Sequence, residues 1–136
     1  MDVDTKDEFG LLRPGDLLSP FLHGGTLDGG ELPYEQLWQK RNVVWFVLPA
    51  RAVATASPYL RDVDDRLSAL TPPDTSLVIS DQAGDGLPLN CVVIADRWGE
   101  VVQAARLAAD PAHWPPVDEI IDWVEFVRAK CPECPP

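Results

Sequence analysis

The strongest indication of the fold is the apolar run Val43-Val44-Trp45-Phe46-Val47-Leu48, followed directly by Pro49. Every residue in this run is β-branched, aromatic or aliphatic, and no polar residue interrupts it. A strand with one solvent-exposed face alternates between apolar and polar residues, whereas a strand covered on both faces is continuously apolar. We therefore expect residues 43–48 to form a central strand of an α/β sheet that ends at the proline.

Further elements are expected on both sides of this strand. Ser57-Pro58 predicts a helix start, because serine can cap a helix and proline is tolerated at its first position. An apolar stripe at helical spacing continues that helix through Leu60, Val63 and Leu67. Short strands are expected at 21–23, 76–80, 91–95 and 100–104, and helices at 33–38 and from about 117 to 130. This order predicts one mixed sheet of about five strands with helices on both faces.

The length and charge of the chain limit its function. It has 136 residues, with 11 basic and 22 acidic side chains and a formal charge of −11. The length fits one domain, and the charge makes nucleic acid and anionic membranes poor partners. No apolar run approaches the length of a membrane span, and the acidic N-terminus has no signal-peptide segment. We expect a cytoplasmic protein, and its bias toward Arg, Pro, Ala and Asp is typical of a GC-rich bacterial genome.

Four segments share a pattern with one superfamily. They are Pro14–Gly30 (with Pro14-Gly15-Asp16, Ser19-Pro20-Phe21 and Leu27-Asp28-Gly29-Gly30), Asn42–Pro49, Ser57–Leu60 and Val93–Val101. In this order they resemble the thioredoxin-like superfamily, and within it the redoxin branch of peroxiredoxins (AhpC/TSA type) and thiol-disulfide reductases. The resemblance implies a three-layer α/β sandwich over residues 12–130. An acidic tail would precede it at 1–11, and a Cys-Pro-Glu-Cys tail would follow it at 131–136.

The same resemblance implies where catalytic thiols would lie. Counting back from Pro58 along the reductase motif reaches Ala50 and Val53. Counting forward from Pro49 along the peroxiredoxin motif reaches Val53 and Ala56. Without a thiolate there is neither attack on peroxide nor disulfide exchange at this site. We therefore expect a redoxin-like domain with a degenerate active site that lacks the usual cysteines.

Two further departures concern the loop before the strand at 91–95. The family's cis-proline would fall on Asn90, whereas Pro88 lies two residues earlier. Either the loop is shifted or the cis-proline is lost. The connection from Ser80 to Cys91 is also short, since relatives usually insert a helix there. We expect this loop to pass over the end of the central strand and partly cover the vacated site.

The motif Cys131-Pro132-Glu133-Cys134 has three interpretations. As a relocated dithiol it would be slow, because a helix C-terminus and Glu133 both raise a thiol pKa. As a zinc knuckle it supplies two ligands of the four that zinc prefers. The others would come from Cys91, His23 or His113, or from the tail of a second chain in a homodimer. In the third interpretation the two thiols have no role.

The remaining polar candidates have simpler interpretations. Cys91 heads an apolar strand and is expected to be an inert core thiol. His23 and His113 are isolated, and we expect each to be structural or exposed. A carboxylate cluster lies on the outer face of the helix that begins at Ser57, and we interpret it as solvated. It consists of Asp62, Asp64 and Asp65.

The five tryptophans divide into two groups. Trp38, Trp45 and Trp123 fit core positions, and Leu37 is expected to face inward beside Trp38. Trp98 at a hairpin tip and Trp114 between prolines are harder to bury. An exposed tryptophan favours contact with a partner, although these two could equally cover the edge of the core.

The sequence therefore favours a protein-binding or subunit module that has lost its catalytic cysteines, without a cofactor. Two alternatives remain. The first is a thiol-disulfide oxidoreductase or antioxidant protein that acts through Cys131 and Cys134. The second is a homodimer stapled by zinc at the same two residues.

Overall fold

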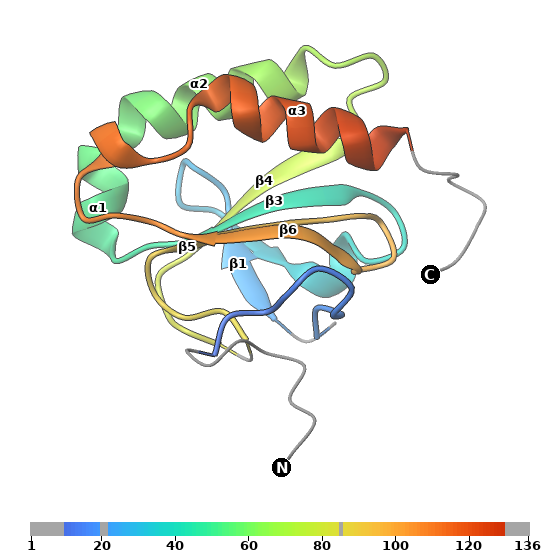
Figure 1. Cartoon of the computed structure of the whole chain (residues 1–136), viewed down its shortest axis with the longest axis horizontal. Helices are drawn as coiled ribbons and strands as arrows, with labels where there is room; N and C mark the ends of the chain where they lie inside the picture. The colour runs from blue at the N-terminus through green and yellow to red at the C-terminus, as the bar shows by residue number, and fades with distance from the viewer. Residues whose placement is uncertain (1–9, 20–21, 85, 130–136) are drawn as a thin grey trace.

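A six-stranded mixed sheet forms the centre of the molecule, in the order β2-β1-β4-β3-β5-β6 (Figure 1). The computed structural model describes residues 10–19, 22–84 and 86–129. The strands are β1 (His23–Gly25), β2 (Glu31–Pro33), β3 (Asn42–Val47), β4 (Thr75–Ser80), β5 (Cys91–Ala95) and β6 (Val101–Arg106). The helices are α1 (Ala50–Thr55), α2 (Ser57–Ser68) and α3 (Val117–Arg128), with 3₁₀ turns η1 (Tyr34–Gln36) and η2 (Pro111–His113). The mixed α/β sheet predicted from the sequence is confirmed, with one strand more than expected.

β3 is the central strand that the apolar run predicts. It pairs in parallel with β4 and antiparallel with β5. All of its residues are buried. Val44 and Phe46 belong to the cluster beneath α2 and α3, whereas Trp45 and Val47 belong to the cluster on the opposite face. This alternation follows from the two-residue period of a strand and explains why no polar residue interrupts the run.

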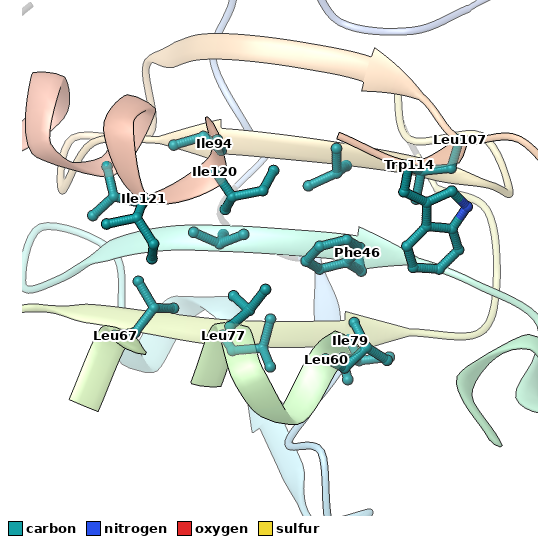
Figure 2. Close-up of a cluster of buried hydrophobic side chains, with 14 of the residues drawn as sticks. Phe46, Leu60, Leu67, Leu77, Ile79, Ile94, Leu107, Trp114, Ile120 and Ile121 are labelled. Atoms are coloured by element: carbon teal, nitrogen blue, oxygen red, sulfur yellow. The ribbon is translucent and has the colours of Figure 1, made fainter. Parts of the chain in front are cut away.

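α2 and α3 cover one face of the sheet, and an aromatic cluster closes the end of this core nearest α1 (Figures 1 and 2). The Phe46 ring stacks on Trp114 with 6.0 Å between centroids, and Tyr59 meets Trp114 edge-on at 5.2 Å. Trp114 Nε1 donates a hydrogen bond of 2.7 Å to the carbonyl of Ala108. The expectation that Trp114 is hard to bury is therefore wrong. Its ring extends the cluster while its N–H keeps a partner.

The opposite face is covered by the N-terminal segment, by η1 and by the loop before β5, without an α-helix among the described residues. The expected helix at 33–38 is a single 3₁₀ turn, and the prediction of helices on both faces is corrected here. Residues three apart share one side of a 3₁₀ turn, so Tyr34 and Leu37 are both buried. Trp38 lies one residue further on and is 37% exposed, contrary to its predicted core position.

α1 is an element that the sequence analysis missed. Its alternating alanines favour a helix, and the N–H of Ala56 donates to the carbonyl of Ala52 at 2.9 Å to close it. Ala56 rather than Ser57 is therefore the N-cap of α2, and no side chain caps that helix. The predicted apolar stripe of α2 is confirmed as buried.

α3 confirms the predicted C-terminal helix, its Ile120, Ile121, Val124 and Val127 side chains are buried, and its last residue anchors it to the loop before β4. Arg128 Nε donates to Asp74 Oδ1 at 3.0 Å, and Nη2 donates to the Thr71 carbonyl at 2.9 Å.

Within the described residues, no helix combines the length and apolar character required to cross a membrane.

Candidate functional site

A cleft of about 500 Å³ lies where the central strands end and α1 begins. Ala50 and Val53 of α1 line it, together with the β1–β2 hairpin and with Asp81, which directly follows β4. β1 pairs with β4 at a single position, Gly25 opposite Ile79, so the hairpin and the end of β4 separate beyond this pair. The cleft thus brings together three segments that are far apart in the sequence.

Gly24 allows the hairpin to approach β4, and Gly25 allows the two strands of the hairpin to approach each other. A Cβ on Gly24 would lie 2.3 Å from Val78 Cγ1, and a Cβ on Gly25 would lie 2.7 Å from the carbonyl oxygen of Gly30. No side chain fits at these distances without a shift of the hairpin. The glycines therefore set the position of the hairpin wall and, with it, the shape of the cleft.

The structure brings two of the three predicted redox-site positions into this cleft. Ala50 and Val53 line it, whereas Ala56 is 1% exposed and lies between α1 and α2. Methyl and isopropyl groups provide neither a nucleophile nor a proton donor nor a metal ligand. These positions therefore contribute shape and apolar surface to the cleft.

The other side of α1 borders a second cleft of about 210 Å³, which includes Arg51 and Asn90. Asn90 lies at the position where the resemblance places a cis-proline. It has a φ of 65°, in the left-handed region that asparagine tolerates, and its N–H donates to the Val47 carbonyl at 2.7 Å. The cis peptide bond of the described chain precedes Pro72, so neither Asn90 nor Pro88 carries that family feature.

The loop after β4 covers this cleft less than the sequence predicted. Asp81 and Gln82 border the cleft, but the loop then turns to the other face of the sheet. Leu87 is 1% exposed there, and the carbonyl of Gly86 accepts a hydrogen bond of 3.0 Å from the N–H of Leu12. Burial of the Leu87 side chain beneath the N-terminal segment accounts for this course of the loop.

Cys91 has no access to the cleft. It begins β5 opposite Val47 and is fully buried in the core on the face away from α2 and α3. Burial raises the pKa of its thiol to about 12, and the opposing effect of Arg106 is smaller. The predicted burial is confirmed, and so high a pKa makes the thiol a poor nucleophile at neutral pH.

The border of the cleft carries negative charge. Glu31 and Asp81 line it, and His23 is the basic side chain among its described lining residues. Asp28 on the hairpin loop also acts on α2, which the loop approaches in Figure 1. The pKa of Asp64 is raised by burial first and by repulsion from Asp65 and Asp28 second. Of the carboxylates interpreted as a solvated face, Asp64 is thus half-buried and faces the hairpin.

The two histidines and the tail cysteines are not brought together in this cleft by the described residues. His113 lies in η2 and is exposed, whereas His23 lines the cleft. Cys131 and Cys134 lie outside the described residues, so their roles as a dithiol or as zinc ligands stay predictions. In the described ranges, no three His, Cys, Asp or Glu side chains are grouped as a metal site.

The contribution of the hairpin to the site was not predicted from the sequence. Glu31 and Asp81 are fifty residues apart in the sequence, and only the register of β1 on β4 brings them to one cleft. The doubled glycines at 24–25 and 29–30 were a usable signal, because such pairs mark close approach of the backbone.

The comparisons with known proteins identify the fold. No protein-family model and no curated protein matches the chain. A reduced 2-Cys peroxiredoxin from Plasmodium vivax is similar to it, with a TM-score of 0.61 and 17% sequence identity over 85% of this chain and 81% of that one. A thiol peroxidase from Chromobacterium violaceum gives a TM-score of 0.49 and 13% identity, covering 87% and 89% of the two chains. The similarity to the peroxiredoxin confirms the predicted thioredoxin-like α/β fold.

Proposed function

We propose that this chain is a redoxin-fold binding or subunit module, in which the cleft beside α1 contacts a protein partner and performs no thiol chemistry. One observation carries the proposal. Ala50 and Val53 line an open cleft at the positions where the resemblance implies catalytic cysteines. The site retains the shape and access of a binding site, while its lining side chains provide no sulfur.

Chemistry supports the loss of peroxidase and disulfide-exchange activity at the cleft. Both reactions begin with attack by a thiolate. With a pKa of about 12, Cys91 would be ionised at roughly one part in 10⁵ at pH 7. Its side chain is also fully buried, so a peroxide or a disulfide has no contact with the sulfur. The described thiol therefore does not replace the missing ones.

The cleft supports a binding role. Its volume of about 500 Å³ falls in the range of ligand sites. Its walls come from a helix start, a hairpin fixed by glycines and the end of a central strand, so the site is formed before a partner arrives. Such preorganisation reduces the entropy lost on binding.

Two measurements on the full-length protein test the proposal. Peroxide consumption and insulin-disulfide reduction are measured for the wild type and for Cys91→Ser, and we expect no turnover that depends on Cys91. Native mass spectrometry of the protein from its own source should show a complex with another protein. The substitution Ala50→Trp fills the cleft without changing charge and should remove that complex. Turnover that disappears in Cys91→Ser would overturn the proposal.

A second candidate function rests on the Cys-Pro-Glu-Cys motif. Cys131 and Cys134 follow the end of α3 at Arg128 in the sequence, and they would act as an oxidoreductase dithiol or as zinc ligands in a homodimer. The double variant Cys131→Ser/Cys134→Ser separates these cases. Loss of disulfide reduction indicates the dithiol, and loss of bound zinc together with dissociation of a dimer indicates the staple. Unchanged behaviour on all three readouts excludes both.

A further inference from the structure

The cleft beside α1 has two kinds of surface. Its apolar part comes from Val53 on α1, Ile79 on β4 and Leu27 on the hairpin. Its charged part comes from Glu31 at the start of β2 and Asp81 just after β4. The cleft therefore offers aliphatic contact and carboxylate acceptors to the same bound group.

Lysine and arginine have the complementary composition. Each carries a cationic group at the end of an aliphatic chain. The aliphatic chain is stabilised by apolar contact, and the cationic group donates hydrogen bonds to carboxylates. No lysine or arginine is among the described residues that line the cleft, and His23 is the basic side chain there. The lining therefore provides no guanidinium or ammonium group of its own to Glu31 and Asp81.

We propose that the cleft receives a lysine or arginine side chain from a basic loop or tail of a partner protein. The aliphatic chain lies against Val53 and Ile79, and the cationic group lies at Glu31 and Asp81. This inference rests on the proposed binding function and names the chemistry of the partner. It adds that the partner is recognised by positive charge at this cleft and not by an apolar anchor alone.

The surroundings of the cleft extend its negative potential. Asp28, on the loop between the two hairpin strands, is close enough to α2 to raise the pKa of Asp64. Arg61 acts in the opposite direction on Asp64, but its effect is the smallest of the four. Approach of a basic segment would relieve this repulsion between carboxylates, so the local charge favours association.

The hairpin also suits an extended segment rather than a lone cation. The cleft is larger than one side chain, which leaves room for the flanking residues of a bound peptide. A Cβ at Gly29 would have no heavy atom within 4 Å, so the backbone of a partner can approach the hairpin there. The formal charge of −11 makes a basic protein segment favourable and a nucleic acid unfavourable as the occupant.

Fluorescence anisotropy with two synthetic peptides tests the inference on the full-length protein. The probe is a labelled glycine-alanine peptide with two arginines, and its partner carries glutamine in place of both. We expect the arginine peptide to bind at least about tenfold more tightly, because hydrogen bonds to charged groups carry the difference. Equal binding of the two peptides would overturn the inference.

Matched variants locate the binding site. The double variant Glu31→Gln/Asp81→Asn should weaken the arginine peptide by about tenfold. The control Glu35→Gln/Asp122→Asn removes the same charge from exposed positions outside the cleft and should leave the affinity within about twofold. Equal weakening by both double variants would show general attraction to an acidic protein and would contradict a site in this cleft. Circular dichroism confirms that all variants are folded.

Further outcomes distinguish failure of this inference from failure of the proposed binding function. If spermine binds with the same sensitivity to Glu31→Gln/Asp81→Asn while the arginine peptide does not bind, the source of the cation is a small molecule and the inference fails. If the natural complex survives Glu31→Gln/Asp81→Asn but is lost in Ala50→Trp, the binding function stands and the cationic partner is wrong. Cysteine-dependent turnover would overturn the proposed function itself, whatever the peptides do.

Discussion

Cys91 and the cleft beside α1 lie at the same end of the sheet, yet they differ in access and in chemistry. Cys91 pairs with Val47 at the end of β3, and Ala50 follows three residues after Val47. The thiol is fully buried with a pKa of about 12, whereas the cleft is open and α1 contributes the methyl group of Ala50 and the isopropyl group of Val53 to it.

The difference arises from the direction of one side chain. Cys91 and Val92 are neighbours in β5, and the two-residue period of a strand sends them to opposite faces of the sheet. Val92 joins the core beneath α2 and α3, and Cys91 joins the core beneath the N-terminal segment. A fold shared with a peroxiredoxin therefore does not by itself provide a reactive thiol, because the reactivity of a cysteine depends on the face of the sheet to which its side chain points.

The largest expected effect comes from displacing the hairpin that forms one wall of the cleft. A valine at position 24 would place carbon atoms against Val78, so Gly24→Val should lower the free energy of unfolding by about 2–3 kcal/mol. Urea denaturation measures this loss. Gly30→Ala is the matched control, because its Cβ would meet only the Thr26 side chain at 3.2 Å. Equal midpoints for the two variants would show that the hairpin is not held by close packing.

Cys91 predicts a pH dependence of stability. Its folded pKa of about 12 lies above the usual value of 9.0, so the folded state retains the proton more strongly than the unfolded state. Stability is therefore complete below pH 9 and declines as the pH rises from 9 toward 12. Between neutral pH and pH 10 the loss should be about 1.4 kcal/mol. Urea denaturation at several pH values should show a steeper decline in the wild type than in Cys91→Ala, in which the raised pKa values of Tyr34 and Tyr59 still reduce stability near pH 10 and above.

The smallest effect concerns the acidic side of the cleft. The pKa of Asp64 is raised by burial and by its carboxylate neighbours, so its ionisation at neutral pH opposes folding. Asp64→Asn should stabilise the protein at pH 7 by a few tenths of a kcal/mol, since solvent screens much of the repulsion. The gain should disappear as the pH falls and the wild-type carboxylate is protonated. Thermal unfolding at pH 7 and pH 3 measures it, and a loss of stability at pH 7 would contradict the repulsion.

The sequence predicted the parts of the fold that depend on long local patterns. The apolar run of β3 and the stripes of α2 and α3 each specify a buried face within one segment. The resemblance also led to Ala50 and Val53, which lie together in one cleft, whereas their relation to catalytic thiols stays a prediction.

Features that depend on non-local packing escaped prediction. α1 is a helix of six residues, too short to show a helical period in the sequence, and its position becomes clear only against the sheet. Trp114 is buried because Phe46 and Tyr59 meet it from distant segments. The charged border of the cleft depends on a single pairing between β1 and β4, which no local pattern specifies.

The most direct test of this account compares the labelling rates of two thiols in the folded protein. In a Cys131→Ser/Cys134→Ser background, iodoacetamide labelling of Cys91 is followed by mass spectrometry with and without Ala50→Cys. We expect the Ala50→Cys thiol to react like an exposed cysteine. Cys91 should react only through unfolding, at a rate on the order of a thousandfold lower or lower still. Rapid labelling of Cys91 in the folded protein would contradict the separation of sulfur from the cleft on which the account rests.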